Sequence, residues 1–186
     1  MTGKTHVLGG MAFAVGGFIC MEKTNMLIPD VNEGLQLGII LPYAIWASTL
    51  PDLDQNKDSV AQISPINLVI QKIFSFTGTK HRGWQSHILP VILAFLAYIG
   101  TAFGLIFKHS NGTEITIIGL IVLGLFLGLL SHMILDMMTR QGLKFGSINL
   151  RLVPDMDLFG AGTKYELIVR RILYIIVCLE ILILII

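Results

Sequence analysis

Histidine and aspartate are the residues of this sequence whose types and spacing could do chemistry. His132 and Asp136 lie four residues apart in the apolar segment LLSHMILDMM, so on a helix they share one face. Asp52 and Asp54 lie two residues apart in TLPDLDQ. Imidazoles and carboxylates together are the ligand set of a divalent transition metal, whereas Ca²⁺ and Mg²⁺ prefer oxygen ligands alone. The pattern therefore indicates a metal site.

Other histidines lie at the edges of apolar stretches. His6 opens the first stretch, and His81 and His87 flank the start of the third in KHRGWQSHIL. Six residues apart, His81 and His87 cannot share a helix face, so one is expected in a loop and the other in the first helical turn. Arg82 suits an anionic substrate oxygen, or it is one more basic residue at the membrane edge. His109 is expected to be an ordinary loop residue.

The composition indicates that these residues belong to a membrane protein. Hydrophobic residues make up 54% of the 186-residue chain and charged residues 13%, and the mean hydropathy is +0.77. A typical soluble domain carries roughly 25% charged residues. So apolar a chain cannot stay disordered in water, two cysteines do not make a disulfide scaffold, and a net charge of +1 argues against a nucleic-acid partner.

Apolar stretches predict an all-α, polytopic membrane helix bundle that forms a single domain over residues 1–186. The five predicted spans are Val7–Met21, Leu35–Leu50, Ile88–Phe107, Ile115–Met138 and Leu167–Ile186. A spanning helix needs about 20 residues, which the last three have and the first two lack. Glycines in the first and fourth stretches predict close helix packing; they include Gly9, Gly10, Gly124 and Gly128.

The basic residues predict the orientation. With five spans and the N-terminus in the cytoplasm, 11 of the 13 Lys and Arg residues lie inside, and only Lys23 and Lys108 lie outside. The C-terminus is then outside. This topology brings a set of ionisable residues to the cytoplasmic face, where such residues at membrane depth are functional by default. The set is His6, Asp52, Asp54, His81, His87, His132 and Asp136.

Both long cytoplasmic loops are predicted to hold structure. Residues Gln62 to Phe76 have apolar side chains near helical spacing, which predicts an interfacial amphipathic helix. It would serve as a ramp for lipid entry or pack on the bundle. The alternating stretch Ile148 to Val153 predicts a short hairpin.

The motifs resemble the YdjM-like family of bacterial inner-membrane metal-dependent hydrolases. The likeness runs in order through MTGKTH, TLPDLDQ, KHRGWQSHIL, GLLSHMILDMMTRQGL and GTKYELIVRRIL. It implies a multi-helix protein of the inner membrane with a hydrolytic metal site. The site residues that it implies are His6, Asp52, Asp54, His81, Arg82, His87, His132, Asp136 and Glu166. One residue more than in the family pattern precedes His87, which leaves its role open.

Two functional interpretations follow. In the favoured one, one or two Zn²⁺ or Mn²⁺ ions serve a hydrolase that acts on an ester or phosphoester of a membrane lipid. Asp52 or Glu166 is then the general base, and Arg82 binds a phosphate. The expected ligands are His6, Asp54, His81, His87, His132 and Asp136. The alternative is a metal or proton transporter or sensor, against which the gathering of polar residues at one face argues.

Overall fold

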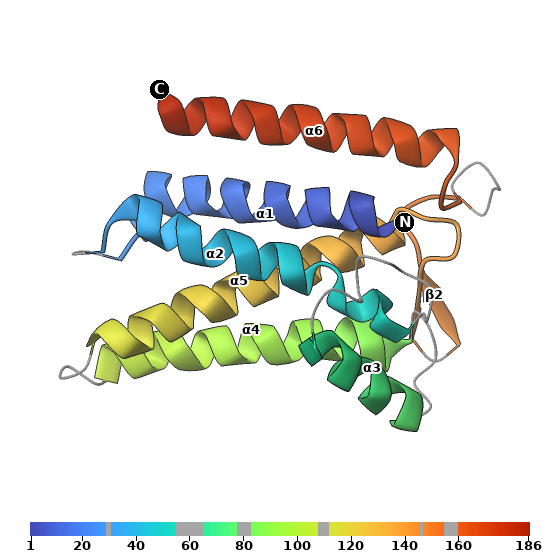
Figure 1. Ribbon diagram of the computed structural model, residues 1–186, viewed down its shortest axis with the longest axis horizontal. Helices are drawn as coiled ribbons and strands as arrows, with labels where there is room; N and C mark the ends of the chain where they lie inside the picture. Colours follow the sequence, from blue (N-terminus) through green and yellow to red (C-terminus); the bar gives the residue numbers. More distant parts are fainter. Residues whose placement is uncertain (29–30, 55–64, 78–82, 108–111, 146, 155–159) are drawn as a thin grey trace.

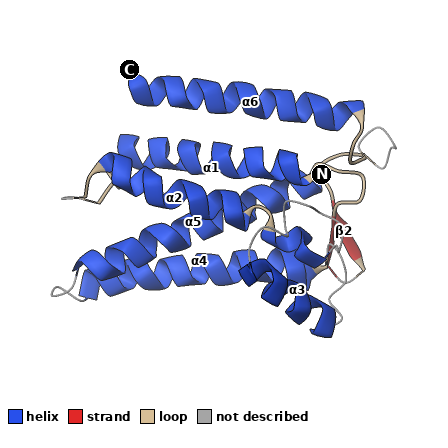
Figure 2. Cartoon of the chain, in the orientation of Figure 1, coloured by secondary structure: helices blue, strands red, loops and turns tan. Residues whose placement is uncertain are grey.

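The chain folds as a helix bundle in a computed structural model (Figures 1 and 2), which describes residues 1–28, 31–54, 65–77, 83–107, 112–145, 147–154 and 160–186. In these ranges lie six α-helices, a short 3-10 helix and one two-stranded hairpin. The helices are α1 (Gly3–Lys23), α2 (Glu33–Ala47), η1 (Leu50–Asp54), α3 (Pro65–Thr77), α4 (Trp84–Phe107), α5 (Gly112–Met137) and α6 (Lys164–Ile185). The strands are β1 (Leu143–Phe145) and β2 (Ile148–Leu150). The predicted helical class is confirmed.

Three helices are long and apolar enough to cross a membrane by length and composition. They are Gly3–Lys23, Trp84–Thr101 and Thr116–Met137. The other two predicted spans fall short for different reasons. Helix α2 has 15 residues, against the roughly 20 that a spanning helix needs. Helix α6 has 22 residues, but it carries Arg170, Arg171 and Glu180 within its apolar stretch.

Glycines set the closest helix contacts of the bundle. A Cβ atom on Gly10 of α1 would lie 2.8 Å from the carbonyl oxygen of Ala44 in α2, and one on Gly128 of α5 would lie 2.2 Å from the same oxygen. Both distances are shorter than any ordinary Cβ contact. Helices α1, α2 and α5 therefore meet backbone to backbone at Ala44, which confirms the packing role predicted for these glycines.

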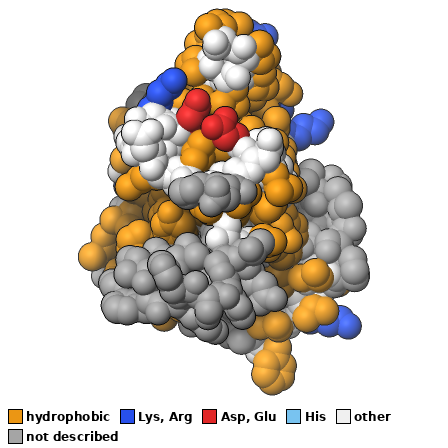
Figure 3. All heavy atoms as spheres, turned by 90° about the vertical axis from the view of Figure 1, so that its left-hand side faces the viewer, with side chains coloured by type: hydrophobic (Ala, Val, Ile, Leu, Met, Phe, Trp, Pro, Cys, Tyr) orange, Lys and Arg blue, Asp and Glu red, His pale blue; other side chains and the backbone are white. Residues whose placement is uncertain are grey.

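The remaining helices attach to this trio. Helix α4 packs on α5, and α6 lies along α1 on the outer side of the bundle (Figure 1). Helices α1 and α6 run in the same direction, as do α2 and α5 (Figure 1). An apolar cluster fills the space between α1, α2 and α5 and includes Phe18, Ile40, Leu120 and Leu123. The end of the bundle where α6 terminates is mostly hydrophobic over its described surface, with few charged side chains (Figure 3).

Helix α3 packs on the bundle with one side and leaves apolar side chains exposed on another. Asn67 is buried and accepts a hydrogen bond from Trp46 Nε1 at 2.8 Å, so the helix packs on the bundle. Leu68, Val69 and Ile73 on the same helix are about half exposed, so it also presents an apolar surface. The predicted helix is confirmed from residue 65 onward. The hairpin is confirmed in part, since β2 ends at Leu150 and pairs with β1.

Candidate metal centre

Four separate elements bring five ionisable side chains to one buried point. The first turns of α1 supply His6, η1 supplies Asp52, the start of α4 supplies His87, and the end of α5 supplies both His132 and Asp136. All five residues are at most 5% exposed. Ionisable groups this deeply buried must compensate one another or bind an ion.

Asp136 is the centre of the cluster. Its Oδ1 lies 3.4 Å from His6 Nε2, and its Oδ2 lies 3.3 Å from His87 Nε2 and 3.5 Å from His132 Nε2. The Met1 amine donates to Oδ1 at 2.9 Å. The rings of His6 and His132 stack with centroids 3.8 Å apart. Three imidazoles therefore converge on one carboxylate.

Asp52 completes the cluster from η1. Its Oδ2 lies 3.7 Å from His6 Nε2, and its Oδ1 lies 3.8 Å from His132 Nε2. Its side chain is 7% exposed, whereas those of the imidazoles and Asp136 are at 0%, so the cluster meets solvent through Asp52. Burial raises the pKa of Asp52, but the imidazoles of His132 and His6 outweigh this and hold the pKa below its ordinary value. The carboxylate is thus ionised, as a ligand or a base must be.

Hydrogen bonds fix which imidazole nitrogen faces the carboxylates. His132 Nδ1 lies 2.7 Å from the Ser48 carbonyl oxygen, which can only accept, so Nδ1 carries a proton and Nε2 is the nitrogen that faces the carboxylates. Ser86 Oγ lies 2.8 Å from His87 Nδ1 and 3.3 Å from the Gly83 carbonyl oxygen. His87 Nε2 therefore faces Asp136, whose Oδ2 lies 3.3 Å away. A second partner that orients the ring in this way is typical of metal-binding histidines.

The donor set and its spacing fit a divalent metal ion. Tetrahedral zinc with bonds of about 2.0–2.1 Å places its ligand atoms about 3.3–3.4 Å apart, and the imidazole–carboxylate distances here run from 3.3 to 3.8 Å. One atom from each of His6, Asp52, His132 and Asp136 lies within 4.8 Å of all the others. Within the described residues, both His6 nitrogens and His132 Nε2 are buried without a hydrogen-bond partner, which is costly unless a cation satisfies them.

Glu166 lies outside the cluster. Its Oε1 accepts hydrogen bonds from the Thr2 backbone N–H at 2.6 Å, Thr2 Oγ1 at 2.6 Å and Thr5 Oγ1 at 2.5 Å. Its Oε2 accepts from the Gly162 N–H. Both oxygens are thus engaged in fastening the start of α1 to the start of α6. This arrangement favours a positioning role for Glu166 over the role of general base.

The other predicted site residues fall where the structure gives no side-chain description. Asp54 ends η1, but its side chain is not among those described. His81 and Arg82 lie outside the described residues, as does His109. Their predicted roles stay predictions.

Sequence reasoning missed three partners of the cluster. The Ser48 carbonyl and the Met1 amine are backbone groups, which leave no signal in residue type. Ser86 did leave a sequence signal, because it directly precedes His87 and its hydroxyl can form a hydrogen bond with an imidazole nitrogen.

Comparison with known proteins identifies a family for most of the chain. The model of the YdjM inner membrane protein family matches residues 1–147, a region that contains all five members of the buried cluster. No curated protein and no solved structure matches the chain.

Proposed function

This chain belongs to the YdjM inner membrane protein family, and from that premise we propose that it is a membrane-bound, metal-dependent hydrolase that acts on an ester or phosphoester of a lipid. The observation that carries the proposal is the buried cluster, in which imidazole Nε2 atoms face carboxylate oxygens with the spacing of metal ligands. Such atoms repel at these distances unless a proton or a metal cation lies between them, and a metal cation can satisfy several of them at once.

His6, His132 and Asp136 would hold the metal, with Asp52 and His87 close enough to complete its coordination. The metal is Zn²⁺ or Mn²⁺, since imidazole-rich sites suit transition metals. When bound, such an ion supplies Lewis acidity that polarises the substrate oxygen and lowers the pKa of water. The protein contributes ligands whose positions are already fixed by Ser48 and Ser86.

Asp52 is our candidate for the general base. Among the group His6, Asp52, His132 and Asp136, Asp52 alone has a side chain exposed to solvent. It also lies on η1 rather than on a bundle helix. A base must reach a water molecule that enters from outside, so this position suits the role. The same carboxylate is close enough to act as a ligand, and the experiment below separates the two roles.

A lipid substrate follows from where the site lies. We propose five spans with the N-terminus in the cytoplasm and the C-terminus outside, which places the cluster at the cytoplasmic face. The exposed apolar side chains of α3, next to η1, would then meet the same membrane surface. Arg82 would bind a phosphate there. Membrane lipids are the proposed partners, and the composition favours no nucleic-acid partner.

The apolar cluster in the other half of the bundle argues against a transport path. Phe18, Ile40, Leu120 and Leu123 fill the space between α1, α2 and α5 beyond the site. An ion path through the membrane needs polar groups along its length. Among the described residues, the ionisable cluster stays at one end.

The decisive experiment assays the purified protein with Zn²⁺ or Mn²⁺ against phospholipids, lipid phosphates and generic phosphodiesters. We expect the wild type to turn over at least one of these substrates. The Asp52→Asn variant should keep the metal, but its turnover rate should fall about 10²–10⁴-fold, as expected for the loss of a general base. Metal loss in Asp52→Asn would instead make Asp52 a ligand. Absence of turnover, together with metal crossing a sealed vesicle that contains the protein, would replace hydrolysis with transport.

A further inference from the structure

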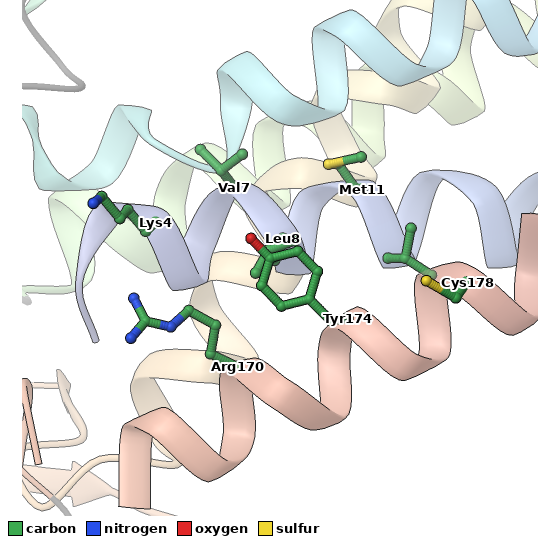
Figure 4. A pocket seen from close by; sticks show the side chains of 8 residues that line it. Lys4, Val7, Leu8, Met11, Arg170, Tyr174 and Cys178 are labelled. Atoms are coloured by element: carbon green, nitrogen blue, oxygen red, sulfur yellow. The ribbon is translucent and has the colours of Figure 1, made fainter. Parts of the chain in front are cut away.

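A groove separate from the metal cluster runs between α1 and α6. Its volume is about 710 Å³, within the range of roughly 300–1,000 Å³ typical of ligand sites. Lys4 and Arg170 lie at one end, and Leu8 and Met11 line it further along (Figure 4). Val177 also lines the groove. Tyr174 lies between the charged end and the apolar part (Figure 4). The groove is therefore polar at one end and apolar along the rest.

The groove does not lead to the metal cluster. Lys4, Leu8 and Met11 follow helical spacing along one face of α1. His6 lies two residues from Lys4 and thus about 200° around the helix, on nearly the opposite face. The groove and the cluster are therefore two sites on two faces of the same helix.

Two cationic side chains, Lys4 and Arg170, form the charged end of the groove. Because α1 and α6 run in the same direction, Lys4 and Arg170 lie at the same end of the bundle (Figure 1). Among the acidic side chains that the structure describes, none forms an ion pair with either of them. Two cations beside an open groove attract an anion from outside the chain.

The outer surface of α6 indicates that the occupant comes from the membrane. Helix α6 packs against α1 through Val169, Leu173 and Val177, whereas Ile175 and Leu179 are more than half exposed. An apolar helix surface of this kind is expected in contact with lipid tails. A ligand in the groove beneath it must then carry a negative charge at one end and an apolar chain along the rest.

We propose that this groove binds one anionic phospholipid, with its phosphate at Lys4 and Arg170 and an acyl chain along Leu8, Met11 and Val177. The Arg170 guanidinium matches phosphate oxygens in a bidentate arrangement, and Lys4 adds a second positive charge. Both side chains have apolar stems that can lie along the groove while their charged ends meet the headgroup. The lipid bridges α1 and α6, and this site is independent of the proposed hydrolysis.

The test measures lipid binding by the purified full chain in a neutral detergent, by native mass spectrometry, with phosphatidylglycerol as the probe. We expect the double variant Lys4→Gln, Arg170→Gln to weaken binding at least about tenfold, since charge-assisted hydrogen bonds are lost. Arg171→Gln is the matched control, because Arg171 neighbours Arg170 but does not line the groove. It should bind as the wild type does, and both variants should keep the metal.

Two further measurements distinguish the occupants. Cys178 lines the groove and Cys20 does not, although both are exposed free thiols. Phosphatidylglycerol should therefore slow maleimide labelling of Cys178 but not of Cys20. Equal protection by phosphatidylcholine, equal displacement by inorganic phosphate, or an equal loss of binding in Arg171→Gln would overturn the proposal. So would protection of Cys178 that depends on protein concentration rather than lipid, since a second copy of the chain would then fill the groove.

Discussion

Replacing Gly128 by alanine should damage the metal centre without touching any of its ligands. The new Cβ would lie 2.2 Å from the Ala44 carbonyl oxygen, while ordinary van der Waals contact begins at 3.4 Å. The difference, about 1.2 Å, is the separation that α2 and α5 must gain. Helix α2 cannot simply yield toward α1, because Gly10 already packs against the same carbonyl group.

The displacement reaches the site through Ser48. Ser48 lies one turn after Ala44, and His132 lies one turn after Gly128, so the two contacts are stacked along parallel helices. The Ser48 carbonyl accepts from His132 Nδ1 at 2.7 Å. Half of the displacement, taken along this bond, already lengthens it past the limit of about 3.2 Å. Losing a partner that orients a metal ligand weakens metal binding about 10–100-fold. Overpacking should also cost roughly 1–3 kcal/mol of stability.

The assay is a zinc competition titration in detergent, with thermal unfolding of the metal-free protein to confirm that each variant is folded. Gly38→Ala meets nothing within 4 Å and is the control, whereas Gly10→Ala is a second disruptive variant because its Cβ would lie 2.8 Å from both the Ala44 carbonyl oxygen and Ser48 Oγ. Zinc affinity should fall in Gly10→Ala and in Gly128→Ala and should equal that of the wild type in Gly38→Ala. A folded Gly128→Ala protein with wild-type zinc affinity would refute the reasoning, as would an equal loss in Gly38→Ala.

Three further predictions follow from the same contacts and from the charge distribution. His132→Ala should lower zinc affinity by about tenfold or more, because a ligand is lost, while His109→Ala should leave the metal content unchanged; the same titration decides both. Glu166→Gln should lower the free energy of unfolding by roughly 1–3 kcal/mol, because the hydrogen bonds from Thr2 and Thr5 lose their charged acceptor. Denaturant unfolding measures this, and an unchanged midpoint would remove the fastening role. Reporter fusions after Lys23 and after Ile186 should both lie outside the cytoplasm, and a cytoplasmic signal after Ile186 alone would mean that α6 does not cross the membrane.

Hydropathy located the helices of this chain better than it located their ends. The sequence predicted the first span from Val7, yet α1 begins at Gly3. The polar side chains of Thr5 and His6 lower the hydropathy at the start of α1, so hydropathy does not include them in the span. In the folded protein both residues are completely buried by other elements. Tertiary contacts therefore extend the helix into polar sequence. Helices α2 and α6 are marginal as membrane spans, because α2 is short and α6 carries internal charges. Length and charge alone do not tell which other elements cover these helices.

The site was predictable as a set of residues but not as an arrangement. The predicted alternation of spans across the membrane places His6, Asp52, His87, His132 and Asp136 at one face, and in the structure these five side chains do lie together. Which oxygen meets which nitrogen depends on the rotation of each helix about its axis, and backbone contacts such as that at Ala44 set this rotation. Glu166 shows the limit most clearly. A carboxylate that fastens two helices has the same sequence signal as one that accepts a proton, and the threonine partners of Glu166 lie more than 160 residues away in sequence.

The backbone contact at Ala44 also decides which parts of the centre can move. Helices whose main chains are in van der Waals contact have no flexible side chains between them to absorb sliding, so we expect α1, α2 and α5 to move as one rigid body. His6, His132 and Asp136 belong to that body and keep their mutual geometry through any opening motion. Asp52 lies on η1, outside the group formed by α1, α2 and α5, and its side chain is the part of the cluster that meets solvent. Ion exchange and substrate entry should therefore follow the opening rate of η1, and local hydrogen exchange at residues 50–54 should be faster than in the three helices.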